Sequence, residues 1–195
     1  MFANGAVTAA VSYAFASLGD SEGAARSSVT GGEPGRIAAE DAEALHRQVL
    51  EVLSTIGIDT SGIQLAPGYG LRDRRGNHRT VSTYEEFIKL SRRRGWTVVG
   101  GYHTTVREPG PWYTLGLGGR TQSIITIYYN AYSTPIYSVP LTNRVWNVTL
   151  EAGFQSGLFV VGHEIGHRRD HHSEPAANEV GRDIYRQVCS GDPRC

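Results

Sequence analysis

The chain has 195 residues, of which 39% are apolar and 24 are glycine, and its acidic and basic residues balance at 19 each. This length fits one domain, or one domain with an appendage, and a zero net charge provides no global field that would attract nucleic acid or an acidic membrane. No apolar run approaches the ~20 residues of a membrane-spanning helix, and the start lacks the basic region of a signal peptide. We therefore expect no nucleic-acid partner, no membrane span and no signal peptide.

The first part of the chain predicts an appendage followed by a folded domain. Residues 5–18 have the composition of a short apolar helix, and residues 19–36 are rich in Gly and Ser without a period, which is typical of a linker. A strong helix follows at 37–57, where apolar residues recur at helical spacing. We therefore divide the chain into an N-terminal segment with its linker, residues 1–36, and a domain over residues 37–195.

Helices and strands segregate along this domain. Residues 66–79 are interpreted as a loop, and residues 82–95 predict a short helix that Ser82 or Thr83 caps. Five strands are then expected, at 96–106, 112–119, 122–130, 135–141 and 145–150. From about Gly153 the pattern is helical, with one break, to about Val188. This order indicates an α+β fold rather than a doubly wound sheet.

The last helical stretch contains His163-Glu164-Ile165-Gly166-His167, an HExxH pattern. Positions i and i+4 of a helix lie on one face, so the two imidazoles can reach one Zn²⁺ ion at ~2.0–2.1 Å. Glu164 is then placed to hold a zinc-bound water and accept its proton. The apolar flank "SGLFVVG" indicates a buried helix, in which polar side chains require partners. A metal ion supplies such a partner.

Four residues compete to be the third ligand. The metzincin pattern, with a His six residues after His167, fails because position 173 is Ser. His171 lies a further helical turn away, and Arg168 indicates that the helix surfaces and ends early. The remaining candidates besides His171 and His172 are the acids Glu174 and Glu179.

Helix geometry favours Glu174 over Glu179. If Ser173 caps a helix that starts at residue 174, Glu174 lies at the border of its apolar stripe, whereas Glu179 faces water. Asn178, one turn after Glu174, is placed to support a ligating histidine. The small residues Ala177 and Gly181 would let the two helices approach closely.

The two segments "HEIGH" and "EPAANEVG" resemble the gluzincin metallopeptidases, whose pattern is HExxH followed by E-x-x-A-[N/D]-x-x-G. The resemblance covers residues 160–185. It implies Zn²⁺ bound by His163, His167 and Glu174, with Glu164 as general base. It also implies a minimal zincin-like fold, in which a small, mostly antiparallel sheet packs on the HExxH helix and on the following Glu-bearing helix.

A second resemblance lies at the start of the chain. The segment "FANGAVTAAVSYAF" (2–15) is similar to the segment that often precedes the C-terminal toxin of bacterial Rhs and related polymorphic toxins. It implies an effector that is secreted or delivered into a target cell, and a cognate immunity protein as partner.

We therefore expect a zinc endopeptidase that cleaves a protein of a target cell. Tyr185 is the preferred candidate to stabilise the oxyanion, since it shares Glu174's side of the helix. Further candidates are His103, His171, His172, Tyr128, Tyr129, Tyr132 and Tyr137. The alternatives are a non-catalytic zinc module, with His171 or His172 as fourth ligand, and a zinc hydrolase of a non-peptide substrate. The sequence leaves open whether Cys189 and Cys195 are bonded.

Overall fold

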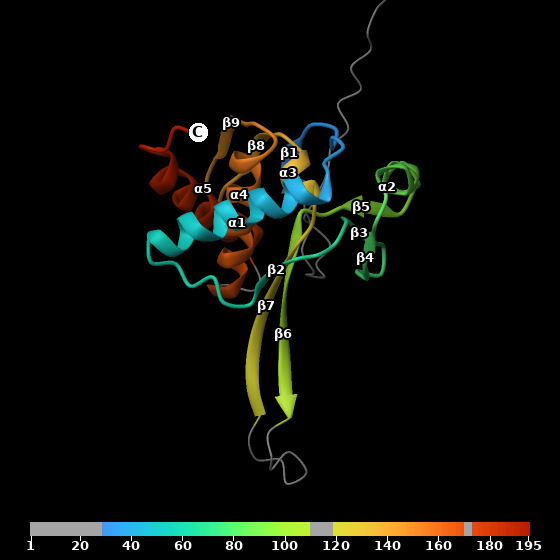
Figure 1. Cartoon of the computed structure of the whole chain (residues 1–195), viewed down its shortest axis with the longest axis horizontal. Helices are drawn as coiled ribbons and strands as arrows, with labels where there is room; N and C mark the ends of the chain where they lie inside the picture. Colours follow the sequence, from blue (N-terminus) through green and yellow to red (C-terminus); the bar gives the residue numbers. More distant parts are fainter. Residues whose placement is uncertain (1–28, 110–118, 170–172) are drawn as a thin grey trace, which may run out of the picture.

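The computed structural model describes residues 29–109, 119–169 and 173–195 (Figure 1). The predicted apolar helix at 5–18 lies outside these residues, as does most of the predicted strand at 112–119. Helices and strands follow one another in the order β1 Thr30–Gly31, α1 Ala39–Thr55, β2 Ile63–Leu65, β3 Tyr69–Asp73, β4 His78–Val81, α2 Tyr84–Ser91, β5 Trp96–Val98, β6 Gly101–Pro109, β7 Gly119–Ile127, α3 Asn130–Ser133, β8 Ile136–Pro140, β9 Val145–Leu150, α4 Phe154–Arg169 and α5 Glu174–Cys189. The predicted α+β class is confirmed. None of the described helices is both long and apolar enough to cross a membrane.

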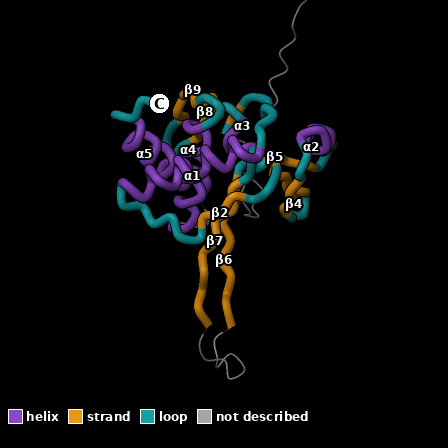
Figure 2. The backbone as a smooth tube through the Cα atoms, viewed as in Figure 1, coloured by secondary structure: helices purple, strands orange, loops and turns teal. Residues whose placement is uncertain are grey.

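The described strands divide among three sheets of three strands, in the orders β1-β8-β9, β2-β7-β6 and β4-β3-β5, rather than forming the single sheet that we expected. Within residues 29–109, 119–169 and 173–195, only β2 and β7 pair in parallel, and the other pairs are antiparallel. The strands β6 and β7 form a long hairpin that projects from the body of the molecule (Figure 2). The base of this hairpin contacts α4, as expected for the strand predicted at 122–130.

Helix α1 packs on α4, and both contribute to the main core. Val49 and Leu53 of α1 are buried there with Leu158 and Val161 of α4. Helix α1 buries side chains that recur at spacings of three and four residues, as an amphipathic helix requires. The main core also includes Ile125 and Ile127 of β7, so it joins α4 both to α1 and to the base of the hairpin.

The prediction of a loop over residues 66–79 is wrong, because β3 and β4 form a hairpin there. Asp73 shapes its turn, since its Oδ1 accepts hydrogen bonds from the backbone N–H groups of Arg75 and Asn77, and Gly76 adopts a φ of 84°. Alternate residues Tyr69, Leu71 and Val81 enter a second apolar cluster that α2 covers. The alternation of apolar residues is short, and the many arginines around it give the segment the polar composition of a loop.

Asn130 ties the sheet β4-β3-β5 to the rest of the molecule. Its Oδ1 accepts a hydrogen bond from the backbone N–H of Gly70, at 2.8 Å, and its Nδ2 donates to the carbonyl of Val99. The Asn130 side chain is buried, so these bonds satisfy polar groups that water does not reach. One side chain thus holds two strands in place against α3.

The two ends of the described chain pack on the body. Val29 is buried, and β1, which follows it, pairs with β8. The end of the predicted linker is therefore in contact with the folded domain. At the other end, a disulfide joins Cys189, at the end of α5, to Cys195.

Candidate metal centre

Helix α4 carries the HExxH residues through the interior. Nearly every residue from Phe154 to His167 is buried, because α1, α3, α5, β6 and β7 all contact this helix. A helix that is covered on all sides presents its polar side chains only to other protein groups. At its end Arg168 is half-buried and Arg169 is exposed, so α4 surfaces and stops at Arg169, as predicted.

Small residues let α4 and α5 approach closely. A Cβ atom on Gly162 would lie 3.0 Å from the Cα of Gly181, and one on Gly166 would lie 2.6 Å from the Cα of Ala177. Each pair of small residues is spaced by four, so the two contacts follow one face of each helix. The close approach predicted from Ala177 and Gly181 is confirmed, and its partners are the glycines that flank His163 and precede His167.

The beginning of α5 places Glu174 opposite the two histidines. Ser173 is the N-cap, and its hydroxyl accepts a hydrogen bond from the backbone N–H of Ala176 at 3.2 Å. Pro175 occupies the first turn, where its missing N–H costs nothing. Glu174 is therefore the first residue of the helix and projects from a fixed end.

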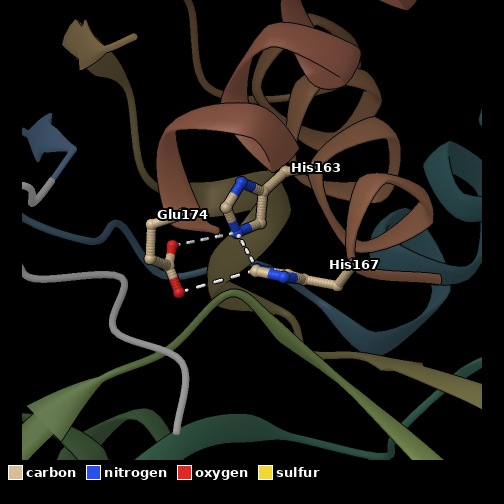
Figure 3. A group of neighbouring side chains, drawn as sticks. All are labelled: His163, His167 and Glu174. Atoms are coloured by element: carbon tan, nitrogen blue, oxygen red, sulfur yellow. Dashed lines mark hydrogen bonds and ion pairs between the residues drawn. The ribbon is translucent and has the colours of Figure 1, made fainter. Parts of the chain in front are cut away.

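Figure 3 shows His163, His167 and Glu174 converging on one point. The Nε2 atoms of the two histidines are 3.0 Å apart. The Glu174 carboxylate lies 3.5 Å from Nε2 of His163 and 3.6 Å from Nε2 of His167. One ligand atom from each side chain falls within 4.8 Å of the others, so this buried group could hold a metal ion.

The donor atoms have the spacing and chemistry of a site for a divalent metal ion, of which zinc is one. Ligand atoms bound tetrahedrally at ~2.0–2.1 Å from zinc are about 3.3 Å apart. The two Nε2 atoms are 3.0 Å apart, and they lie 3.5 and 3.6 Å from the two different oxygens of the Glu174 carboxylate. Two imidazole nitrogens and one carboxylate are also a ligand set that zinc accepts.

The surroundings of His163 favour its neutral form, which is the form that binds a metal. Burial lowers the pKa of His163, while the charge of Glu174 and the side chain of Asn178 raise it by smaller amounts. The Nδ2 group of Asn178 donates to the carbonyl of Pro140 at 2.8 Å, and its Oδ1 and the Nδ1 of His163 are buried without another partner among the described residues. Asn178 is thus placed, as predicted, to accept the Nδ1 proton of His163.

Glu164 is buried beside this group without being one of its three ligands. Burial raises the pKa of Glu164 well above its usual value, and the charge of Glu174 raises it further. Its Cγ atom fits against β6, where a Cβ on Gly101 would lie 3.0 Å away. A carboxyl group whose pKa is raised holds a proton more readily than an ordinary one, as a group that takes up and releases protons in catalysis does.

The other predicted site residues lie elsewhere. Glu179 accepts a hydrogen bond from the backbone N–H of Thr142, and so it is not the third ligand of this group. Tyr185 lies 11 residues after Glu174 on α5, which is about 16 Å along the helix axis, and its ring packs 5.8 Å from Trp146. His103 contacts the Ser123 hydroxyl, and His171 and His172 lie outside the described residues.

The structure adds four residues to this region, three of which sequence reasoning did not consider. Arg72 and His78 face each other across the hairpin β3–β4, and Tyr102 lies on β6 next to Gly101. Tyr128, which was a minor candidate, is buried, and the charge of Glu164 contributes to the raised pKa of its phenol, although burial contributes more. The short alternation of residues 69–73 was the only signal for Arg72.

Comparisons with protein-family models, with curated proteins and with solved structures give no match to this chain.

Proposed function

We propose that the chain is a zinc-dependent endopeptidase, and that His163, His167 and Glu174 hold the metal. The single observation that carries this proposal is the buried Glu164 carboxyl, which lies beside a group of three residues with the ligand types and spacing of a zinc site. A site that only stabilises the fold has no need of a fourth, non-ligating carboxyl with a raised pKa.

In the proposed reaction Glu164 moves protons and the other residues hold their positions. Zinc, when bound, acts as a Lewis acid and lowers the pKa of water. The Glu164 carboxylate accepts the proton of the attacking water and then gives it to the nitrogen of the leaving amine. His163 is oriented by Asn178, and the glycine contacts between α4 and α5 hold Glu174 against both histidines.

The substrate is a protein or peptide in this proposal, and β6 provides a place for an extended chain. This strand is at the edge of the sheet β2-β7-β6, and its first residue contacts Glu164. An exposed strand edge binds an extended peptide through main-chain hydrogen bonds. The peptide bond would then pass next to Glu164.

We further propose a biological setting on the resemblance of residues 2–15 alone. The chain would be the toxin part of a bacterial effector, delivered into a target cell, and a cognate immunity protein would bind it in the producing cell. The minimal zincin-like fold belongs to the same proposal.

The test is expression of the wild type and of Glu164→Gln in a bacterial host, followed by a proteome-wide search for new N-termini. Glutamine keeps the shape of the side chain but accepts no proton, so cleavage should disappear while the zinc content stays at one per chain. A variant that cleaves as fast as the wild type contradicts the peptidase. Zinc-dependent loss of another bond type, without new N-termini, would show a hydrolase of a different substrate.

A further inference from the structure

One face of the hairpin β3–β4 is turned towards the candidate metal centre. Side chains alternate between the two faces of a strand, and Tyr69 and Leu71 enter the apolar cluster under α2. Gly70 and Arg72 therefore share the opposite face. There a Cβ atom on Gly70 would lie 2.1 Å from the ring of Tyr128, so this face packs directly on Tyr128.

A stack of rings connects this face with Glu164. His78 is the direct cross-strand neighbour of Arg72, and its ring lies 4.2 Å from that of Tyr102. The Tyr102 ring in turn lies 5.9 Å from that of Tyr128. Gly101, next to Tyr102, contacts Glu164. These contacts link the pair Arg72 and His78 with the part of β6 that borders Glu164.

Arg72 is an unusual residue in this position. Its side chain is half-buried, and its Nη1 atom is buried without a hydrogen-bond partner among the described residues. Nδ1 of His78 is in the same state. Burial lowers the pKa of Arg72, and the charge of Glu174 raises it, so the guanidinium lies within electrostatic range of the metal ligand.

A buried guanidinium donor without an acceptor leaves a hydrogen bond to be made. The planar fork of arginine matches a carboxylate, which accepts two parallel hydrogen bonds from it. A cation that stands beside a metal centre can hold a second negative group of a ligand that the metal already binds. We propose that Arg72 is a specificity-determining residue that binds a carboxylate of the substrate next to the bond that is cleaved. The carboxylate is either the side chain of an acidic residue or a free C-terminus, and the second case would make the enzyme a carboxypeptidase rather than an endopeptidase.

This inference rests on the proposed metal centre, but not on the nature of the bond that is cleaved. The probes are therefore simple acids and not substrates: succinate, glutarate and adipate, each compared with the monoacid of the same length, butyrate, pentanoate or hexanoate. Binding to the zinc-loaded full chain is measured by isothermal titration calorimetry. One carboxylate is expected to bind at the metal, and the second reaches Arg72 at the matching chain length.

We expect at least one diacid to bind the wild type about tenfold more tightly than its monoacid, which is the effect of one hydrogen-bonded charge pair. Arg72→Met should abolish this preference. The matched control is Arg75→Met, since Arg75 is an exposed arginine in the turn of the same hairpin, and it should keep the preference. If Arg72→Met does not fold, Arg72→Lys replaces it, and its preference should fall at least about threefold because the fork is lost.

Three results would overturn the role of Arg72: no diacid preference at any length, a preference that survives its substitution, or an equal loss in Arg75→Met. The zinc content of each protein is measured separately by mass spectrometry. A chain that retains no zinc contradicts the metal centre itself, whereas a zinc-loaded chain without diacid preference contradicts only the carboxylate subsite.

Two peptide pairs distinguish the sources of the carboxylate, with zinc-loaded Glu164→Gln as the binding protein. The first pair is trialanine with a free or an amidated C-terminus, and the second is an amidated tripeptide with Glu or Gln in the last position. Tighter binding of the free acid identifies a C-terminal carboxylate, and tighter binding of the Glu peptide identifies an acidic side chain. Equal binding within both pairs would contradict the proposal.

Discussion

The helix pair α4–α5 and the sheet β4-β3-β5 border the same site but are held together differently. The helices meet through main-chain contacts at Gly162 and Gly166, where no side chain separates them. The sheet rests on side chains, namely the ring of Tyr128 and the amide of Asn130. The first contact leaves little freedom to the two helices that carry the three candidate ligands, while the second holds the sheet through side chains.

The comparison suggests different roles for the two regions, metal binding for the helix pair and substrate recognition for the sheet, in the function that we propose. The residues that could share one metal ion come from two helices in close contact, and a displacement of 1 Å would break such a ligand geometry. The residue proposed to recognise the substrate, Arg72, comes from a sheet that is attached by a few side chains. Damage to the first region should therefore remove both metal and stability, and damage to the second should leave the metal in place.

The largest effect is expected for Gly166→Ala. The new methyl group would lie 2.6 Å from the Cα of Ala177, and neither main chain can move without separating the helices. Overpacking of this kind costs about 3 kcal/mol of unfolding free energy, which exceeds the roughly 1 kcal/mol that alanine gains over glycine in a helix. Urea unfolding measures the loss, and the variant should bind zinc more weakly.

The control for this variant is Gly191→Ala, since nothing lies within 4 Å of a Cβ atom there. Its unfolding free energy should stay within about 0.5 kcal/mol of the wild type. Equal stability of the two variants would show that the α4–α5 contact is looser than described.

A smaller effect is expected for Gly70→Ala in the sheet. Its methyl group would meet the Tyr128 ring at 2.1 Å, and the ring must shift, at a cost of about 2 kcal/mol. The zinc content should remain at one per chain, because Tyr128 is not one of the three ligands. Zinc loss equal to that of Gly166→Ala would remove the distinction between the two regions.

The dependence of stability on pH gives a third test, in the core behind α4. Nδ1 of His46 lies 2.6 Å from the Tyr132 hydroxyl, and burial lowers the pKa of His46 from 6.5 to about 4. Above pH 6.5 His46 is neutral in both the folded and the unfolded chain, so it does not make the free energy of unfolding depend on pH. Between pH 6.5 and 4 only the unfolded chain takes up the proton, so stability falls as the pH falls.

Between pH 7 and pH 5 the protonation of His46 in the unfolded chain lowers the free energy of unfolding by about 2 kcal/mol. The free energy of unfolding of the wild type should fall by that amount relative to His46→Gln, measured in urea at both pH values. Parallel profiles of the two proteins would mean that His46 is protonated in the folded chain.

The smallest effect belongs to the surface of the sheet. Arg79 and Glu86 form an ion pair at 2.8 Å, with side chains that are 49% and 44% exposed. Such pairs contribute little in water, so Arg79→Ala should cost less than about 0.5 kcal/mol. A loss above 1 kcal/mol in urea unfolding would give this surface a structural importance that its exposure does not suggest.

The two regions also differ in how far the sequence predicts them. The α4–α5 pair could be predicted because helical period, the cap at Ser173 and the spacing of HExxH all depend on local residues, and these also selected Glu174. The hairpin β3–β4 was missed because its apolar residues are few and arginines surround them. Its contact with the site depends on Gly70 and Asn130, which are 60 residues apart in the chain, and no local pattern encodes such a contact.

The position of Tyr185 shows a second limit of prediction from the sequence. It was selected because it shares a side of the helix with Glu174, but three helical turns separate the two residues. A shared angular position on a helix does not bring two residues together when the rise along the axis separates them. The residues that the structure links to Glu164 are instead Gly101 of β6 and Tyr128, which follows β7.

The most direct test of the central claim is the zinc content of four purified chains after equilibration with the metal, measured by mass spectrometry. The wild type and Glu164→Gln should each hold one zinc ion per chain, whereas His167→Ala and Glu174→Ala should hold none after dialysis. A wild type without zinc, or a Glu174→Ala variant that holds as much as the wild type, would contradict the metal centre described here.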